Sequence, residues 1–472
     1  MALTDAPTVT TDQLTELQAG IATARATFDS GRTRPLAWRK AQLDGLLRVL
    51  KEGEAELSAA LATDLGKPTT EGWAADIGTP ASEIRHIRKH LAKWMAPRKA
   101  KLPMSAQPGK GTIVPEPLGV ALIIAPWNYP VQLLIEPLAA ALAAGNAAVL
   151  KPSELAPATA EVLTTLLRRH LDNEAIFIAN GGVDVSTALL AEKFDHIFFT
   201  GSTSVGRVVM KAAAEHLTPV TLELGGKSPT IIDSSARIDV TAKRLVWSKF
   251  LNAGQTCVAP DYVLVTAQNR DALLDQMAEA ISTFYGDDPA ASPDLARIVN
   301  RRHLDRLAGY LQAPGAGTVA IGGQIDAADR FMAPTVVLDP ELDTPLMTDE
   351  IFGPILPIVT VADLDEAIAF VNARPKPLAL YLFAEDDAAA DQVIASTSSG
   401  SVCVNHAVVQ ILPAELPFGG VGESGMGRYH GKSGFETFSN MKSVMQRPTK
   451  LDPPVAYPPT NAFKDRLIRK LL

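Results

Sequence analysis

The first hundred residues carry apolar side chains that recur every three or four positions. This spacing runs through residues 11 to 62 and 70 to 98, for example at Leu43 and Leu46, and it predicts amphipathic helices. A segment rich in proline, glycine and lysine, "APRKAKLPMSAQPGKG", follows at 96 to 111. Such a segment cannot form the interior of a helix, so we expect an exposed connection or an extended arm there.

From residue 118 the pattern changes to short, continuously apolar runs that alternate with helical segments. The runs are "LGVALIIAP", "AAVLKPSE", "AIFIANGG" and "HIFFTGSTSVG". Strands that are apolar on both faces are typical of a parallel sheet covered by helices on both sides. A second series begins near "SPTIID" and runs to about residue 430, so we predict two α/β domains with their seam near "LELGGKSP". The tail, "PTNAFKDRLIRKLL", is a candidate for a short basic amphipathic helix.

Composition and charge restrict the class of protein, its partners and its cellular compartment. The chain has 472 residues, of which 47% are hydrophobic and 20% charged, and its net charge is −8. These values indicate a soluble globular protein of two or three domains, and they argue against nucleic acid or an anionic membrane as the main partner. Two cysteines, Cys257 and Cys403, cannot build a disulfide framework, so we expect a reducing cytoplasm. We expect neither a signal peptide nor a membrane-spanning run.

A glycine-containing turn in "FFTGSTSVGRVVMKAAAEHL" lies between a predicted buried strand and a predicted helix. Backbone N–H groups at such a helix N-terminus can bind a phosphate. The turn has Gly201 and Gly206 with no glycine between them, so it departs from the G-x-G-x-x-G pattern of dinucleotide sites. The residues alone leave two interpretations open, a dinucleotide site or an ordinary strand-to-helix connection.

Three further residues each allow a structural and a chemical interpretation. Glu223 stands in the apolar setting of "TLELGG", where a carboxylate is either paired or raised in pKa for work as a general base. Asn128 in "APWNYP" is either a turn former or a donor to an oxyanion. Cys257 in "NAGQTC" is either a buried small side chain or a nucleophile. No cysteine-and-histidine spacing typical of a metal site accompanies these residues, and we expect no metal.

Six motifs taken together resemble the aldehyde dehydrogenase superfamily over about residues 30 to 445. They are "PWNYP", "KPSE", "FTGSTSVG", "LELGGKSP", "GQTC" and "EIFGPILP", and they occur in the family's order. Further segments, such as "LPFGGVGESGMGRYHGKSGFETFS", are similar to the class 3 branch, which includes fatty and aromatic aldehyde dehydrogenases and many bacterial relatives. The resemblance implies an α/β fold with a Rossmann-type cofactor domain, an α/β catalytic domain and a small oligomerisation arm.

The resemblance also implies the chemistry. Cys257 matches the family's nucleophile, Glu223 matches the base that activates water, and Asn128 matches the side-chain donor of the oxyanion hole. An aldehyde would then pass through a thiohemiacetal and a thioester on Cys257, and water would release the carboxylic acid. Two alternatives are a CoA-acylating dehydrogenase and a noncatalytic scaffold that keeps the fold. Retention of Glu223 counts against the first, and the intact set of three residues counts against the second.

The implied cofactor is NAD, with NADP as a second usable dinucleotide. Glu154 matches a contact to the adenosine ribose, and its carboxylate would repel a 2′-phosphate, whereas a swing of the Lys151 ammonium onto that phosphate would offset part of the repulsion. The full set of implied cofactor contacts is Trp127, Lys151, Glu154, Gly201, Ser202, Gly206, Leu224, Glu350 and Phe352.

Domain limits and partners follow from the same resemblance. We expect a small-molecule aldehyde as the substrate, no nucleic acid, no stable membrane anchor, and a homodimer formed through the arm. The tail either packs across that dimer or lies on a membrane surface. The predicted division is 1–98 and 113–226 for the dinucleotide-binding domain, 227–437 for the catalytic domain, 99–112 and 438–450 for the oligomerisation arm, and 451–472 for the C-terminal tail.

Overall fold

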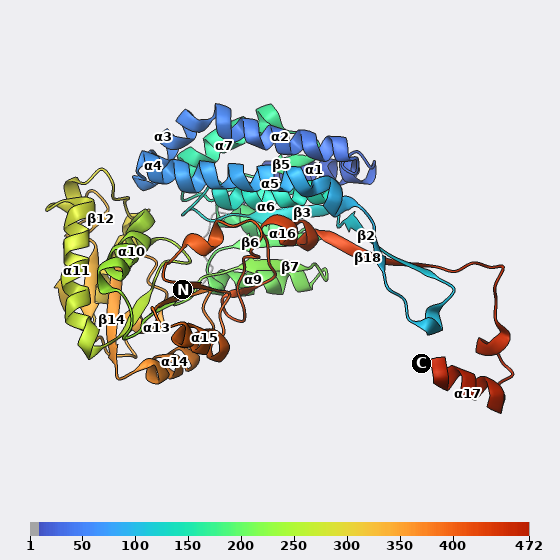
Figure 1. The fold of residues 1–472 in the computed structure, drawn as a ribbon. Coiled ribbons are helices and arrows are strands. Elements are labelled where there is room, and N and C mark those ends of the chain that lie inside the picture. The colour runs from blue at the N-terminus through green and yellow to red at the C-terminus, as the bar shows by residue number, and fades with distance from the viewer. Residues whose placement is uncertain (1–8, 472) are drawn as a thin grey trace.

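Two large sheets organise the chain in the computed structural model, which describes residues 9–471 (Figure 1). The predicted α/β fold is confirmed. The first sheet contains six strands, in the spatial order β17 (Gly425–Met426), β7 (Val220–Glu223), β6 (His196–Thr200), β3 (Val120–Ile124), β4 (Ala147–Lys151) and β5 (Ile176–Ile178). All neighbours in it are parallel except β17, which pairs antiparallel with β7.

Helices cover both faces of the first sheet, as the continuously apolar strands predict. In β3, Ala121 and Ile123 join one buried cluster, whereas Val120, Leu122 and Ile124 join the other, because successive side chains of a strand point to opposite faces. One face packs against α2 (Leu36–Glu52), α3 (Glu54–Leu65), α5 (Thr79–Met95), α6 (Gln132–Ala144) and α7 (Pro157–His170). The other face packs against α1 (Thr11–Asp29), α8 (Val183–Leu190) and α9 (Thr203–Ala214).

The second sheet has seven strands and begins where the second apolar series was predicted. Their spatial order is β10 (Thr318–Ile321), β13 (Thr335–Leu338), β14 (Ile355–Val361), β9 (Tyr262–Thr266), β8 (Pro229–Ile232), β15 (Ala379–Phe383) and β16 (Ser401–Val404). Only β10 runs antiparallel to its neighbour. One face packs against α10 (Ile238–Phe250) and α11 (Ala267–Tyr285), and the other against α14 (Leu364–Asn372) and α15 (Asp387–Ser396).

Short elements complete these two layers. A four-residue helix, α4 (Thr69–Gly72), leads into a π-helix, η1 (Trp73–Gly78), between α3 and α5. The 3-10 turn η3 (Leu251–Gly254) follows α10 and precedes Cys257. Further elements of the second domain are η4 (Pro289–Ala291), α12 (Arg301–Gln312), β11 (Ile325–Asp326), β12 (Phe331–Met332), α13 (Pro345–Thr348) and η5 (Val409–Ile411).

A three-stranded sheet forms an arm beside the first domain. Its strands are β1 (Arg98–Ala100), β2 (Lys110–Pro117) and β18 (Ser439–Gln446), with η2 (Met104–Ala106) in the loop between β1 and β2. The predicted extended segment is therefore confirmed, and β2 pairs with β18 along its whole length. Because β2 continues past residue 112, the arm sheet extends beyond the limit that we placed there.

The segment between β16 and the arm returns to the first sheet. β17 adds to its edge beside β7, and α16 (Gly431–Thr437) places Phe435 in the same buried cluster as α5 and α6. The predicted range 227–437 thus contributes a strand and a helix to the layers of the dinucleotide domain. The domain limits of the sequence analysis stay a prediction.

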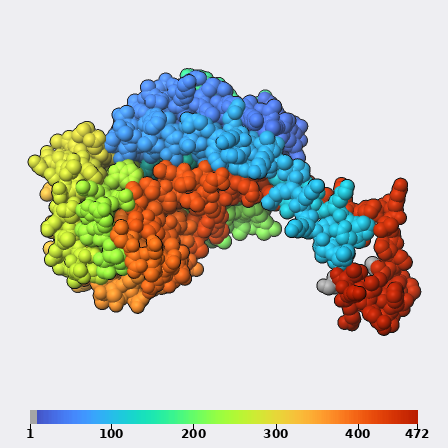
Figure 2. All heavy atoms as spheres, viewed as in Figure 1, coloured from blue at the N-terminus to red at the C-terminus, as the bar shows by residue number. Residues whose placement is uncertain are grey.

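The C-terminal tail leads away from the body of the molecule, next to the tip of the arm (Figure 2). It contains η6 (Pro454–Ala456) and α17 (Ala462–Leu471), in which Phe463 is 72% exposed. Across residues 9–471, no helix combines the length and apolar character that a membrane span requires.

Candidate active site

The turn before Cys257 has an unusual backbone. Asn252, Ala253 and Gly254 follow one another with φ values of +52°, +51° and +73°. A Cβ at Gly254 would lie 2.2 Å from the carbonyl oxygen of Gly353, so only glycine fits there. A non-glycine residue in the left-handed region costs about 1–3 kcal/mol, and it persists where surrounding contacts fix it. The turn predicted from "NAGQTC" is therefore present, and it depends on its neighbours.

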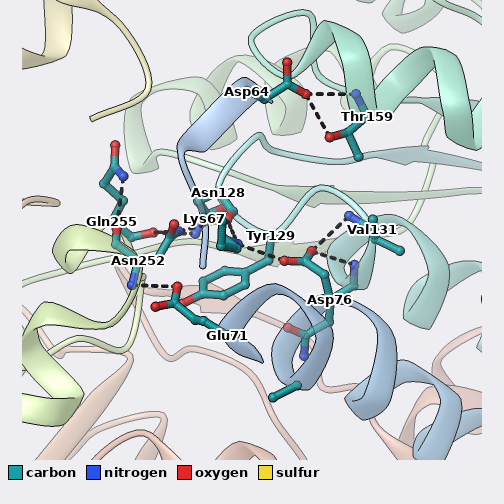
Figure 3. A network of polar contacts seen from close by, with 12 residues as sticks. Asp64, Lys67, Glu71, Asp76, Asn128, Tyr129, Val131, Thr159, Asn252 and Gln255 are labelled. Carbon is teal, nitrogen blue, oxygen red and sulfur yellow. Dashed lines mark hydrogen bonds and ion pairs between the residues drawn. The ribbon is translucent and has the colours of Figure 1, made fainter. Parts of the chain in front are cut away.

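A network of hydrogen bonds holds this turn (Figure 3). The Asn252 amide N–H donates to Glu71 Oε1 at 2.9 Å. Its side chain donates to the carbonyl oxygens of Asn128 at 2.9 Å and Gln255 at 3.2 Å. The Gln255 side chain in turn donates to the carbonyl oxygens of Asn252 and Arg297, each at 3.0 Å. Contacts with residues distant in sequence thus fix the backbone from Asn252 to Gln255, just before Cys257.

Asn128 lies in the loop between β3 and α6 and is almost completely buried. Its side-chain amide donates to the carbonyl oxygen of Gln255 at 3.0 Å, and its own carbonyl oxygen accepts from Lys67 Nζ at 2.9 Å. Both the side chain and the main chain of Asn128 are therefore held. An amide has two N–H donors, so the contact with Gln255 leaves one of them for a ligand.

A fully buried ion pair supports the Asn128 loop. Lys67 Nζ and Asp76 Oδ2 are 2.8 Å apart, and neither side chain is exposed. Asp76 Oδ1 also accepts from the amide N–H groups of Val131 at 3.1 Å and Gln132 at 3.3 Å. A carboxylate at the first amides of a helix is stabilising, so the pair joins the Asn128 carbonyl to the start of α6.

Glu223 ends β7, where its carbonyl oxygen accepts from the Gly201 amide at 3.0 Å. Both of its carboxylate oxygens are buried without a hydrogen-bond partner among the described residues. Burial raises the pKa of Glu223 well above its ordinary value, and the positive charge of Arg428 opposes that rise. Arg428 Nη1 and Glu223 Oε1 each lie 2.9 Å from the position that a Cβ on Gly419 would occupy. The guanidinium is therefore near the carboxylate.

Cys257 lies close to two carboxyl groups. Burial raises the pKa of its thiol to about 12, and the negative charges of Glu350 and Glu223 add to the rise. The structure thus brings together Cys257, Glu223 and Asn128, which belong to three separate stretches of the chain.

A cavity of about 520 Å³ opens onto Cys257. Residues from α4, η1, α6, η3, α11 and the segment 408–430 line it. Its walls are largely apolar, which is usual for small-molecule sites. The aromatic residues that line it are Tyr129, Trp247, Phe284, Tyr285, Phe418 and Tyr429.

The predicted phosphate turn stands at the start of α9. Ser202 is the N-cap of this helix, and its hydroxyl accepts from the Val205 amide at 3.4 Å. A Cβ at Gly206 would lie 2.7 Å from Leu224 Cδ2, so glycine lets the helix pack closely on the segment after β7. The first amide N–H groups of this helix are suited to bind a pyrophosphate.

Glu350 borders a second cleft, of about 480 Å³, beside Gly225. Glu350 Oε1 is buried without a partner in the described part of the chain, and a Cβ on Gly225 would lie 2.1 Å from Glu350 Oε2. The ring of Phe352 meets Trp127 edge-on at 5.4 Å between centroids. A carboxylate free to accept hydrogen bonds fits the hydroxyls of a nicotinamide ribose.

Lys151 and Glu154 form an ion pair at the end of β4, with 3.1 Å between Nζ and Oε2. Lys151 Nζ also donates to the Pro152 carbonyl oxygen at 2.8 Å, and its residue is 1% exposed. Glu154 lines a further cavity of about 480 Å³ with Ser153. The ammonium is thus committed to these two partners. Its contact with a 2′-phosphate would require this ion pair to rearrange, and it stays a prediction.

Sequence patterns did not predict the residues that support the site, namely Lys67, Glu71, Asp76 and Arg428. The first three are isolated charges outside the quoted motifs. Arg428 stands within "LPFGGVGESGMGRYHGKSGFETFS", but nothing there indicates its partner, so only the fold reveals these contacts. A signal existed for Asn252 and Gln255, since both flank the cysteine in "NAGQTC".

Two histidines pair on one face of α5. His86 and His90 stand one turn apart on α5, with ring centroids 4.3 Å apart. Among residues 9–471 there is no group of three or more histidine, cysteine or acidic side chains placed to hold a metal ion. The expectation of no metal stays a prediction.

Comparisons with known proteins agree with this geometry. The model of the "Aldehyde dehydrogenase family" matches residues 4–444. "Aldehyde dehydrogenase family 3 member B1" of Rattus norvegicus is 46% identical over 95% of this chain and 95% of its own. "Aldehyde dehydrogenase, dimeric NADP-preferring" of Canis lupus familiaris is 45% identical over 94% of this chain and 98% of its own. A solved structure, "Substrate bound state of Staphylococcus Aureus AldH", has a TM-score of 0.93 and 43% identity over 96% of this chain and 99% of that chain.

Proposed function

Because the chain belongs to the aldehyde dehydrogenase family and resembles its class 3 members, we propose that Cys257, Glu223 and Asn128 carry out its reaction. That reaction is the NAD(P)-dependent oxidation of an aldehyde to a carboxylic acid. One observation carries the assignment of these residues. The carboxylate of Glu223 has no hydrogen-bond partner among the described residues, and it lies close enough to Cys257 for its negative charge to raise the pKa of the thiol.

The first steps belong to Cys257 and Asn128. The thiol gives its proton to a solvent water molecule, and its sulfur attacks the aldehyde carbon to form a thiohemiacetal. The free N–H of the Asn128 amide donates to the developing oxyanion, together with the Cys257 main-chain N–H. A donor of this kind contributes roughly 2.7–4 kcal/mol to lowering the barrier in comparable sites. The hydrogen bond from the Asn128 amide to the Gln255 carbonyl oxygen orients this donor before the substrate binds.

The dinucleotide would be held by the α9 N-terminus at Ser202, by Glu350 and by Glu154, and when bound it supplies the acceptor for the hydride that the thiohemiacetal loses. The acyl group then remains on Cys257 as a thioester. Glu223 takes a proton from a water molecule, and the resulting hydroxide attacks the thioester carbon and displaces the Cys257 sulfur. A buried carboxylate with a raised pKa suits this work, because the raised pKa makes it a stronger base.

Substitution of Glu223 by glutamine tests the assignment. Glu223→Gln should keep a single-turnover burst of reduced dinucleotide while the steady-state rate collapses, because deacylation follows oxidation. Intact-mass measurement should find the acyl group on Cys257. Cys257→Ala should abolish both phases, whereas Cys403→Ala serves as the matched control and should change little. An unchanged steady-state rate in Glu223→Gln would remove the base role, and formation of acyl-CoA on addition of CoA would favour the CoA-acylating alternative.

We also propose that the protein is a homodimer that joins through the arm and the tail. The arm sheet has two outer strands, β1 and β18, whose far edges pair with nothing in residues 9–471, and open edges favour strand pairing between chains. Large apolar side chains on this part of the molecule are exposed, for example Met104 at 70% and Phe463 at 72%. A second copy would bury them.

Light scattering measures this directly, and the mass of a monomer or a tetramer would contradict it. Removal of residues 451–472 should weaken the dimer if the tail packs on the partner. If the tail instead binds a membrane surface, its removal should abolish binding to anionic vesicles and leave the mass unchanged. We further propose a cytoplasmic location, because both cysteines are free and free thiols persist in a reducing compartment.

A further inference from the structure

The charged side chains that line the cavity at Cys257 are mostly acidic. Its acidic lining residues are Glu71 and Asp294, and His430 is the only other side chain in the lining that can carry charge near neutral pH. Within the part of the chain that the structure describes, the lining contains neither lysine nor arginine. Asp294 is exposed to solvent, which screens its charge. Glu71 is therefore the acidic group that a bound substrate would meet inside the cavity.

Glu71 presents one of its two oxygens to this cavity. Oε1 accepts from the Asn252 amide, whereas Oε2 has no hydrogen-bond or ion-pair partner among the described residues and is not fully buried. The carboxyl group lies beside the ring of Tyr129 (Figure 3). The cation that acts on it, Lys67, is paired with Asp76 and also lies over the Tyr129 ring, with Nζ 4.0 Å from the ring centroid. This second oxygen is thus available to a ligand, because no residue in 9–471 pairs with it.

The charged and titratable groups around Glu71 are Lys67, Asp76, Tyr129 and Tyr285. Burial raises the pKa of Glu71 to about 7, and the positive charge of Lys67 opposes that rise. Burial also raises the pKa of both tyrosines, so they stay neutral near pH 7. Glu71 therefore gains its negative charge as the pH rises through neutrality, and the tyrosines present uncharged aromatic rings.

We propose that Glu71 is a specificity-determining residue that favours aldehydes with a cationic group at the end remote from the carbonyl and disfavours those with a carboxylate there. A carboxylate next to aromatic faces is a suitable environment for an ammonium or quaternary ammonium group. An anionic group in the same place would meet like charge and lose its hydration. The inference rests on the proposed function, since it takes Cys257 as the point where the aldehyde reacts.

Two aldehydes of nearly the same shape test this. 4-Trimethylammoniobutanal carries a permanent charge, and 5,5-dimethylhexanal is its neutral carbon analogue. We expect Glu71→Gln to lower the ratio of kcat/KM between the charged and the neutral aldehyde about tenfold relative to wild type. Glutamine keeps an acceptor for the Asn252 amide, so the turn before Cys257 stays supported. Glu16→Gln, which removes an exposed carboxylate on α1, is the matched control and should keep the wild-type ratio.

The wild-type enzyme provides a second measurement if Glu71→Gln fails to fold. The same ratio should rise from about pH 6 to about pH 8 as Glu71 ionises, because neither aldehyde titrates in that range. 5-Oxopentanoate, an aldehyde with a carboxylate, should be the poorest of the three substrates. A ratio that is unchanged in Glu71→Gln, or flat with pH in wild type, overturns the proposal. Oxidation of the neutral aldehyde through Cys257 would still stand in that case, so the failure of the two proposals can be told apart.

Discussion

The side-chain amide of Asn128 donates to the carbonyl oxygen of Gln255, with 3.0 Å between the two atoms. The residues are 127 positions apart, and Gln255 lies two residues before Cys257. This bond therefore fixes the distance between the proposed oxyanion donor and the proposed nucleophile. It joins the loop after β3 of the first sheet to the turn before β9 of the second, so the site depends on the packing of the two domains.

Substitution of Asn128 should affect the chemical step more than binding. Asn128→Ala removes a donor that acts on the oxyanion, so kcat should fall about 10²–10³-fold, whereas KM should change much less. Steady-state kinetics with a single aldehyde measure both. Dinucleotide affinity, followed by fluorescence titration, serves as the control and should stay near the wild-type value. An equal loss in KM with kcat unchanged would contradict the role.

The buried pair of Lys67 and Asp76 should contribute to stability as a unit. Lys67→Met leaves the Asp76 carboxylate buried without its cation, and we expect the free energy of unfolding to fall by about 3–5 kcal/mol. The double variant Lys67→Met with Asp76→Asn should recover part of that loss, because no uncompensated charge remains. Urea denaturation of the two variants measures the difference. A double variant that is less stable than Lys67→Met alone would refute this account.

The pH dependence of turnover should report the interaction of Arg428 with Glu223. Burial raises the pKa of Glu223 and Arg428 opposes that rise, so Arg428→Gln should raise this pKa further. The base form would then appear only at higher pH, and the acid limb of the kcat profile should move upward in pH under conditions where deacylation limits the rate. Arg48→Gln, an exposed change on α2, is the control. A downward shift for Arg428→Gln would contradict the proposed contact.

Cofactor preference should depend on Glu154. We expect wild type to prefer NAD and to accept NADP, because Glu154 repels a 2′-phosphate and holds Lys151 in an ion pair. Glu154→Gln removes the repulsion and frees the ammonium, so the ratio of kcat/KM for NADP to that for NAD should rise. Measurement of both dinucleotides at one saturating aldehyde gives this ratio. A clear wild-type preference for NADP would show that another basic residue governs the site.

Local sequence patterns were enough to identify the layers of the fold. The continuously apolar run at β3 sends Ala121 and Ile123 to one face and Leu122 to the other, and burial of both faces requires helices on each side. Motifs in the family's order predicted Cys257, Glu223 and Asn128 as the catalytic residues, because the chemistry demands those residue types in fixed local settings. The spacing of polar residues, by contrast, did not predict that Lys67, Glu71 and Asp76 hold these residues in place.

The tertiary structure alone decided how the site is held. Lys67 meets the Asn128 carbonyl across 61 positions, and Glu71 meets the Asn252 amide across 181. No periodic or local sequence pattern predicts either contact, because each joins a single side chain to a backbone group that is distant in sequence. The edge strand β17 at Gly425 is likewise set by the free edge of β7, not by its own two residues. Helices and strands follow from the pattern of apolar and polar residues close together in the sequence. The strained turn before Cys257 persists only because charged and amide groups from distant parts of the chain hydrogen-bond to it.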